Sequence, residues 1–258
     1  MARHEGRVAL EGRVAWVTGA GSGIGEAGAL ALAAEGARIV LTGRRKAPLE
    51  ALAGRIKAAK GEAHVEAGDL REAATAERIA AAIGERFGRL DILVNNAGGN
   101  ILERDWKRLT PAGIDEVIGA NLSQAFYCAR VVLPFMRARK DGVLIHTASF
   151  AGRFVHPLSG SAYSAAKHGV VAMSYGINME ECVNGIRSTA ICPGEVATPI
   201  LDKRPVPVSA EDRARMLQPE DCGELIRYVA CLPPHVCINE VVITPTWNRG
   251  YVAMLPRG

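Results

Sequence analysis

Residues 13–25 of this 258-residue chain read RVAWVTGAGSGIG, and they predict how the fold begins. The apolar run 13–18 is typical of a short buried strand, and glycines follow it at 19, 21, 23 and 25. The Ala- and Leu-rich stretch 26–35 has helical spacing and is stopped by Gly36. Glycines between a strand and a helix allow a tight turn in which backbone N–H groups and the helix dipole hold a pyrophosphate. The stretch therefore predicts a dinucleotide-binding unit, although glycines also end strands in other proteins.

The register of this turn decides which glycines approach the ligand. A G-x-G-x-x-G string also exists at Gly23, Gly25 and Gly28, but it would begin inside the helix. The string TGAGSGIG at 18–25 starts at the end of the strand and opens the helix, as a pyrophosphate-binding turn requires. We therefore favour this second register.

The same alternation of apolar runs and helical segments continues along the chain. Further strands are predicted at 38–42, 64–67, 91–94, 142–147, 186–191 and 240–244, and helices at 48–60, 72–87, 111–140, 161–184 and 219–232. Pro134 is expected to end or bend the helix 111–140 late. The strands lack polar–apolar alternation, which indicates a parallel sheet covered on both faces. We expect an α/β fold: a Rossmann-like, doubly wound sheet of about seven parallel strands, in a single domain of residues 1–258.

Two segments stand outside this pattern. Residues 199–219 contain four prolines and are either a substrate loop or a simple connector. Residues 1–8 are expected to be disordered.

Composition excludes several classes of protein. Hydrophobic residues make up 48% and charged residues 22% of the chain, the range of folded rather than disordered proteins. The 31 Lys and Arg against 27 Asp and Glu leave a net charge of +4, too small a bias to indicate a nucleic-acid partner. No apolar run approaches the ~20 residues that cross a bilayer, and the N-terminus lacks the apolar core of a secretory signal. We expect a cytoplasmic protein with no membrane partner.

The six cysteines show no C-x-x-C spacing and are expected to be reduced. The nearest approach to a metal site is Cys231, His235 and Cys237, but prolines at 233 and 234 lie between them. A structural zinc site needs paired ligands at short spacing, so no metal is expected.

The end of the second strand bears on the choice of cofactor. In this fold an acidic residue there accepts the adenosine ribose hydroxyls, whereas a basic residue suits a 2′-phosphate. Residues 41–46 read LTGRRK, with no carboxylate and three consecutive cations, and an Arg fork matches a phosphate bidentately. We therefore favour NADP(H), held by Arg44 and Arg45, over NAD(H), while a solvated basic turn is the plainer interpretation.

A tyrosine and a lysine supply candidate reactive groups. Tyr163 and Lys167 are four residues apart at the start of a predicted helix, which places them on one face. A free tyrosine has a pKa near ~10, and a nearby ammonium lowers it by favouring the phenolate. A shift of about three pKa units needs roughly 4 kcal/mol, which requires the cation and an oxidised nicotinamide to act together. Ser149 follows the preceding strand, where open α/β sheets bind ligands. Alone, such a Tyr/Lys pair is more often structural.

Taken together, these motifs resemble those of the short-chain dehydrogenase/reductase family over roughly residues 6–251. The resemblance rests on their order and spacing, since each is weak alone. The motifs are TGAGSGIG at 18–25, Asp69-Leu70, NNAG at 95–98, Asn121, Ser149, YSAAK at 163–167, and Pro193-Gly194 with Thr198.

The resemblance implies a catalytic tetrad of Asn121, Ser149, Tyr163 and Lys167. Tyr163 would be the general acid in reduction and the base in oxidation, and Ser149 would hydrogen-bond the substrate oxygen. Lys167 would bind the nicotinamide ribose and depress the pKa of Tyr163, while Asn121 would hold a water in a proton relay. Asp69 would contact the adenine, Asn95 and Gly98 would line the cofactor path, and Thr198 would bind the carboxamide. The full set of expected cofactor-binding residues is Gly19, Gly21, Ser22, Gly23, Ile24, Gly25, Arg44, Arg45, Asp69, Leu70, Asn95, Ala97, Gly98, Tyr163, Lys167, Pro193, Gly194, Val196 and Thr198.

The chemistry implied is hydride transfer between NADP(H) and a carbonyl or secondary alcohol of a small molecule. Alternatives are an NAD(H)-dependent alcohol dehydrogenase, a 3-oxoacyl reductase, a dehydration or epimerisation on the same fold, and a dinucleotide-binding sensor without turnover. Relatives are often tetramers packed through the long helices and the last strand, so a homo-oligomer, a tetramer or dimer, is expected. Fold alone does not select the substrate.

The sequence does not assign a role to some residues around the expected pocket, and other residues depart from the family pattern. Asn100, Arg153 and His156 could touch the substrate or serve only local structure, whereas His146 in a strand is expected to be a satisfied core histidine. The last strand runs into Pro245-Thr246-Trp247 where the family commonly has a Gly-Gly turn. The loop 199–219 is short, so the pocket is expected to be open or completed by the C-terminus.

Overall fold

The strands of the computed structural model, which describes residues 9–203 and 207–256, form one parallel sheet. Their spatial order is β3-β2-β1-β4-β5-β6-β7, which confirms the predicted doubly wound sheet of about seven strands. The expectation of disorder at 1–8 lies outside the described residues. The strands are β1 (Val14–Thr18), β2 (Arg38–Thr42), β3 (Ala63–Val65), β4 (Ile92–Asn95), β5 (Gly142–Thr147), β6 (Ile186–Pro193) and β7 (Glu240–Ile243).

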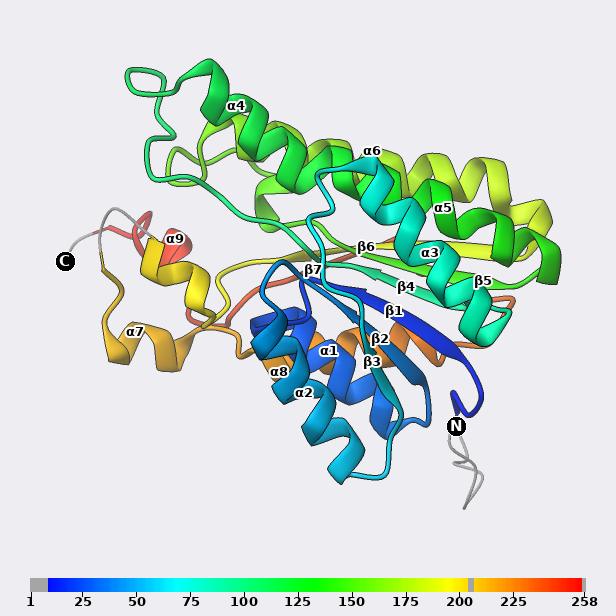
Figure 1. Cartoon of the computed structure of the whole chain (residues 1–258). Helices are drawn as coiled ribbons and strands as arrows, with labels where there is room; N and C mark the ends of the chain where they lie inside the picture. The colour runs from blue at the N-terminus through cyan, green and yellow to red at the C-terminus, as the bar shows by residue number, and fades with distance from the viewer. Residues whose placement is uncertain (1–8, 204–206, 257–258) are drawn as a thin grey trace.

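Helices cover both faces of the sheet (Figure 1). One face carries α1 (Gly23–Ala34), α2 (Lys46–Ala58) and α8 (Pro219–Ala230). The other carries α3 (Ala73–Phe87), α5 (Gln124–Arg139) and α6 (Ser161–Glu181). A further helix, α4 (Pro111–Ile118), precedes α5 along the chain. Two helical layers around a parallel sheet explain why its central strands read as continuous apolar runs.

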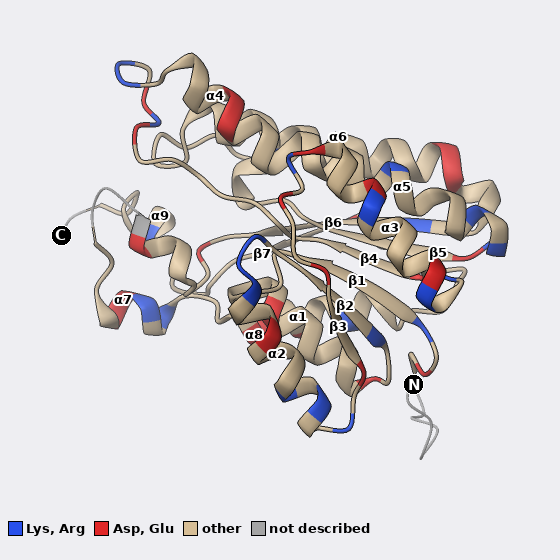
Figure 2. Cartoon of the chain, viewed as in Figure 1, with Lys and Arg blue, Asp and Glu red and all other residues tan. Residues whose placement is uncertain are grey.

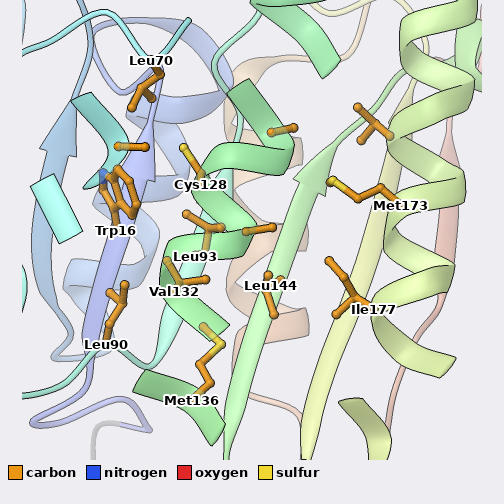
Figure 3. Packing of buried hydrophobic residues seen from close by; sticks show 14 of the residues in the cluster. Trp16, Leu70, Leu90, Leu93, Cys128, Val132, Met136, Leu144, Met173 and Ile177 are labelled. Atoms are coloured by element: carbon orange, nitrogen blue, oxygen red, sulfur yellow. The ribbon is translucent and has the colours of Figure 1, made fainter. Parts of the chain in front are cut away.

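Successive residues of each strand enter opposite cores. In β1, Val14 and Trp16 pack on the side of α3 and α5, whereas Ala15 and Val17 pack against α1 and α2. Figure 3 shows Trp16 in the first of these cores, beside side chains of α5. Its indole N–H donates to the Thr42 hydroxyl at 2.9 Å, so this buried polar group is satisfied. The two cores hold the carboxyl end of β1 rigidly, and the glycine turn starts there.

The predicted continuous helix 111–140 is wrong, because a π-helical turn, η1 (Gly119–Ser123), separates α4 from α5. Pro134 neither ends nor breaks α5, which continues to Arg139. A proline in a helix removes one N–H donor, but Val132 and Met136 on either side are fully buried and hold the helix against the sheet. The interruption of the helix lies instead at the π-helical turn, which contains Asn121. Such π-bulges occur often at functional sites.

Four short helices among the described residues lie outside the predicted pattern. They are η2 (Phe150–Gly152) after β5, η4 (Pro199–Lys203) and α7 (Ala210–Arg215) in the proline-rich segment, and α9 (Arg249–Val252) near the C-terminus. Figure 1 shows α7 and α9 at the left, apart from the helices that cover the sheet. None of the described helices is long and apolar enough to cross a bilayer.

Candidate active site

The candidate site lies where the strand order changes direction, between β1 and β4. Crossovers leave these neighbouring strands toward opposite faces of the sheet, so a crevice opens at their carboxyl ends. Two cavities of about 590 and 660 Å³ occupy this region and share lining residues such as Gly19, Ser22 and Gly98. Together they form one continuous binding region.

The glycine turn excludes side chains, both by its backbone conformation and by the close approach of neighbouring atoms. Gly19 and Gly23 adopt φ values of 63° and 58°, which disfavour side chains. A Cβ on Gly19 would lie 2.8 Å from Ala97 Cα, and one on Gly23 would lie 2.9 Å from Thr198 Cγ2. A Cβ on Gly25 would be only 2.4 Å from the Gly19 oxygen. The turn therefore needs glycine at these three positions.

Hydrogen bonds tie the glycine turn to the loop after β4. The Thr18 hydroxyl accepts from the backbone N–H groups of Asn96, at 2.9 Å, and Ala97, at 3.0 Å. The Asn96 side chain donates back to the carbonyls of Thr18 and Gly19, at 3.2 and 3.3 Å. The two loops that border the crevice are thus held against each other.

Asn95 does not border either cavity, contrary to its expected place on the cofactor path. It is the last residue of β4, so its side chain follows the strand register into the core and donates to the Ala125 carbonyl at 2.8 Å. Asn96, one residue beyond the strand, borders the cavity instead. Sequence reasoning missed Asn96 because the strand's end could not be placed to one residue.

Asn121 is held rigidly inside the π-helical turn. Its amide nitrogen donates to the carbonyls of Val117, at 2.8 Å, and Gly99, at 2.7 Å, and its oxygen accepts from the Gly99 N–H at 3.2 Å. A Cβ on Gly98 would lie 2.7 Å from this oxygen and 3.5 Å from the Lys167 nitrogen. Asn121 therefore fixes the loop at Gly98 and Gly99 beside Lys167.

Ser149, Tyr163 and Lys167 border the same cavity as Asn121. Ser149 begins η2 (Phe150–Gly152) just after β5, and its hydroxyl accepts from the Ala151 N–H at 3.1 Å. The Lys167 nitrogen lies 5.6 Å from the centre of the Tyr163 ring, one helical turn back. The structure thus brings together the four residues of the tetrad that the resemblance implies.

The Lys167 ammonium is buried and lies at the carboxyl end of β5. It donates to the Thr147 carbonyl at 2.8 Å, and the residue is 4% exposed. Burial lowers its pKa to about 8, because desolvation disfavours the charged form. At pH 7 the amine is still mainly protonated, so Lys167 places a poorly hydrated positive charge beside Tyr163.

His146 lies beneath α6 with its Nε2 3.1 Å from the Ser188 hydroxyl, which in turn lies 2.7 Å from the Ser174 hydroxyl. The residue is fully buried and does not border the cavities, as expected of a core histidine, but its Nδ1 has no hydrogen-bond partner among the described residues, so it is only partly satisfied. Burial, with a smaller contribution from the charge of Lys167, lowers its pKa to about 3. His146 is therefore neutral at physiological pH.

The second cavity ends at the basic turn after β2. Arg44 and Arg45 both border it and are exposed, and in the described part of the chain neither guanidinium forms an ion pair. Lys46, by contrast, pairs with Glu50 at 3.1 Å and does not border the cavity. Figure 2 shows this turn in blue between β2 and α2. The turn therefore presents to the cavity two guanidinium groups that form no ion pair with any described residue.

Asp69 and the neighbouring Leu70 border the same cavity as the basic turn. Its carboxylate is tied to Arg71, with the closest N···O distance at 2.6 Å. That hydrogen bond lowers the pKa of Asp69 below its ordinary value. Asp69 is thus held as an anion at the edge of the cavity.

A family model described as short chain dehydrogenase matches residues 13–206. The chain belongs to this family. It is 34% identical, over 92% of its length and 98% of the relative's, to an uncharacterized oxidoreductase of Staphylococcus aureus. It is similar to the structure of a metagenomic short-chain oxidoreductase in complex with NADP, with 32% identity, a TM-score of 0.81 and coverage of 92% and 99% of the two chains. It also resembles a 3-ketoacyl-(acyl-carrier-protein) reductase of Brucella melitensis complexed with NADH, with 30% identity, a TM-score of 0.81 and coverage of 91% and 98%.

Most of the residues expected from the short-chain dehydrogenase motifs border the two cavities. Gly25 does not, because it packs against Gly19 from inside α1. Of the three residues left open, Asn100 and His156 border the cavity, whereas Arg153 pairs with Glu240 at 2.9 Å. The other expected residues that border a cavity are Gly21, Ser22, Gly23, Ile24, Ala97, Pro193, Gly194, Val196 and Thr198.

Further charged residues of this dehydrogenase border the first cavity and were not foreseen. Arg104 reaches it from the loop after β4, Glu195 from the segment after β6, and Arg249 from α9. They are far apart in sequence and carry no motif, so no sequence signal could have found them.

Among the described residues no group of three or more His, Cys, Asp or Glu could hold a metal ion.

Proposed function

We propose that this oxidoreductase is NADP(H)-dependent and interconverts a carbonyl and a secondary alcohol, with Tyr163 as the acid and base. The observation that carries the proposal is the meeting of Ser149, Tyr163 and Lys167 at one cavity, continuous with the glycine turn. A protein that only bound a dinucleotide would have no need of a buried ammonium one helical turn from a tyrosine.

The residues around the two cavities fit a dinucleotide. The start of α1 and the turn at Gly19 and Gly23 offer backbone N–H groups where a side chain would not fit, which suits a pyrophosphate. Asp69 and Leu70, which line the second cavity, would lie beside the adenosine, and Thr198, which lies next to Gly23, would meet the nicotinamide end. These residues support the expected path of the cofactor.

When bound, the nicotinamide supplies or accepts the hydride. In reduction, the Tyr163 hydroxyl donates its proton to the carbonyl oxygen, and the Ser149 hydroxyl donates a hydrogen bond to the same oxygen. The positive charge of Lys167 stabilises the resulting phenolate of Tyr163. Asn121 holds the loop at Gly99 against the π turn, where a water would complete a proton path from Lys167. Oxidation of the alcohol reverses these proton transfers.

The reaction is tested with a panel of ketones and secondary alcohols, each offered with both cofactors and followed by nicotinamide absorbance. We expect NADPH-dependent reduction of some ketones and the reverse reaction with the matching alcohols. Tight cofactor binding without turnover on any member of a broad panel would contradict the proposal and indicate a dinucleotide-binding sensor.

The preference for NADP(H) is tested at Arg44. Replacing it with glutamine is expected to raise the Kd for NADPH about tenfold or more, because a charge-assisted hydrogen bond contributes roughly 1.5–3 kcal/mol. The Kd for NADH should hardly change, since that cofactor has no 2′-phosphate. Both constants are measured by fluorescence titration.

Lys46→Gln is the matched control for Arg44→Gln. It removes one positive charge from the same turn, but Lys46 faces Glu50 rather than the cavity. A similar loss of NADPH affinity in both variants would show a general effect of charge. Equal affinities of the unaltered protein for the two cofactors would refute the preference.

Homo-oligomer formation and a cytoplasmic location remain predictions. Exposed apolar residues on the long helices, Phe126 on α5 and Met179 on α6, support association through these helices.

A further inference from the structure

Large apolar side chains surround the substrate end of the first cavity and remain exposed there. Phe154, Leu158 and Ile200 all line the cavity, yet they are 53%, 42% and 43% exposed. Phe154 stacks on Phe150, another lining residue, with ring centres 4.5 Å apart. Apolar side chains from separate segments that converge on a reactive cavity are typical of a site that takes an apolar ligand group.

The charged groups of this cavity are engaged within the protein. A guanidinium nitrogen of Arg104 donates to the Leu158 carbonyl at 3.3 Å, and Lys167 donates to Thr147. Arg249 and Glu195 form an ion pair with each other. The ion pair matters for the substrate, because a carboxylate on the substrate would have to displace Glu195 in order to bind Arg249.

The C-terminal segment closes the far side of the same cavity. Residues 248–250 and Ala253 line it, and Arg249 anchors them. The Arg249 guanidinium donates to both carboxylate oxygens of Glu195, at 2.8 and 2.7 Å, and to Asp212 at 3.2 Å. The hydrogen bond with Glu195 is the main reason that the pKa of Arg249 is raised. The anchor therefore stays charged and joins α9 to the segment after β6 and to α7.

Residues 248–250 and Ala253 form what we call the C-terminal wall of the cavity. Two aromatic contacts hold the residues beside it in place. Arg215 of α7 lies over the Trp247 ring, 4.9 Å from its centre. The Tyr251 ring meets Phe150 edge to face, with centres 6.5 Å apart. These contacts join the C-terminal wall to α7 and to η2, so its position can limit the size of a bound molecule.

We propose that this site selects ketones with an extended apolar substituent, and that Arg249 positions the C-terminal wall against which the substituent ends. The proposal rests on the proposed carbonyl reduction and names its substrate class. The carbonyl lies at Ser149 and Tyr163, and the substituent lies along Phe154, Leu158 and Ile200 toward Ala253. A hydride from NADPH is added to the carbonyl carbon and a proton from Tyr163 to the oxygen, which yields the alcohol and NADP⁺.

The first test measures kcat/KM for unbranched methyl ketones of increasing length with saturating NADPH. We expect kcat/KM to rise by up to about fourfold per methylene, the factor that corresponds to burial of one CH₂, and then to level off at the wall. A ketone of the same length that ends in a carboxylate should react more slowly. Equal values along the series, or a preference for the carboxylate, would overturn the inference.

This test separates the two proposals. Reduction of all ketones at one rate would leave the proposed carbonyl chemistry standing and refute the apolar selectivity. Binding of NADPH without reduction of any ketone or alcohol in the panel would refute the proposed function, and the substrate class with it.

The second test examines the wall through Arg249→Gln. We expect KM for the longest ketone to rise about tenfold while its kcat, and both constants for the shortest ketone, stay nearly unchanged. Arg227→Gln is the matched control, because Arg227 also pairs with two carboxylates, Glu35 and Glu224, and is 30% exposed against 31% for Arg249. It does not border the cavity and should leave the length profile unaltered.

Ala253→Phe keeps the wall hypothesis testable if Arg249→Gln does not fold. A larger side chain on the wall should shorten the chain length at which kcat/KM levels off. An unchanged length profile in Ala253→Phe, or a uniform fall in kcat for all ketones in folded Arg249→Gln, would show that the segment has only a structural role.

Discussion

Replacing Tyr163 with phenylalanine is expected to lower kcat for ketone reduction by a factor of about 10² to 10⁴, the usual contribution of a positioned acid or base. The variant keeps the ring near Lys167 and removes only the hydroxyl that would protonate the carbonyl oxygen. Steady-state rates with NADPH and the best ketone of the panel measure the effect. NADPH affinity, measured by fluorescence titration, should change far less than kcat.

Tyr175→Phe is the control for this variant. Tyr175 lies on the same helix, and its hydroxyl contacts Glu240 at 3.4 Å instead of the cavity. Turnover in Tyr175→Phe should match that of the unaltered protein. Full turnover in Tyr163→Phe would remove Tyr163 from the proton transfer and assign the acid to another group.

His146 is expected to make the protein sensitive to acid. Its pKa is about 3 in the folded state against 6.5 in the ordinary state, so between these values the unfolded chain binds a proton that the folded protein does not. The free energy of unfolding therefore falls as the pH falls through this window, and the contribution of His146 is complete only above pH 6.5. Over the whole window the loss is about 5 kcal/mol.

Urea unfolding of His146→Leu at pH 7.5 and pH 4.5 tests this expectation. The difference in unfolding free energy between the two pH values should shrink by about 2.5 kcal/mol. The Ser188 hydroxyl keeps its partner Ser174 in the variant. His146→Gln should flatten the pH dependence in the same way, even if its stability differs, because glutamine also does not titrate. An unchanged difference in both variants would contradict the pKa assigned to His146.

The framework of the sheet was predictable because its signals are local. Apolar runs such as 38–42 and 142–147 match β2 and β5 in full, since a strand buried on both faces tolerates few polar residues. The discounted string at Gly23 indeed falls inside α1, which begins at that residue. The π turn around Asn121 was not predictable, because no residue type marks a π turn and its shape depends on Gly99 across the crevice.

Some residues of the candidate site were also predictable from local signals, and others were not. Ser149, Tyr163 and Lys167 became candidates because one strand end and one helical turn place them. Their roles came from the resemblance to the family, since such a Tyr/Lys pair alone is more often structural. Asn95 was misplaced and Asn96 missed, because a shift of one residue at the end of β4 moves a side chain from the core to the crevice.

The amino-acid sequence determines the parallel sheet, the glycine turn and the Tyr163–Lys167 pair, since each depends on residues close together in the chain. The folded structure determines what surrounds them: the loop locked by Thr18 and Asn96, and the wall at α9. Arg249 and Glu195 are 54 positions apart and meet because β6 and the C-terminal segment end at the same edge of the sheet. No short-range pattern encodes such a contact, because it forms only when the packed cores have brought these segments together.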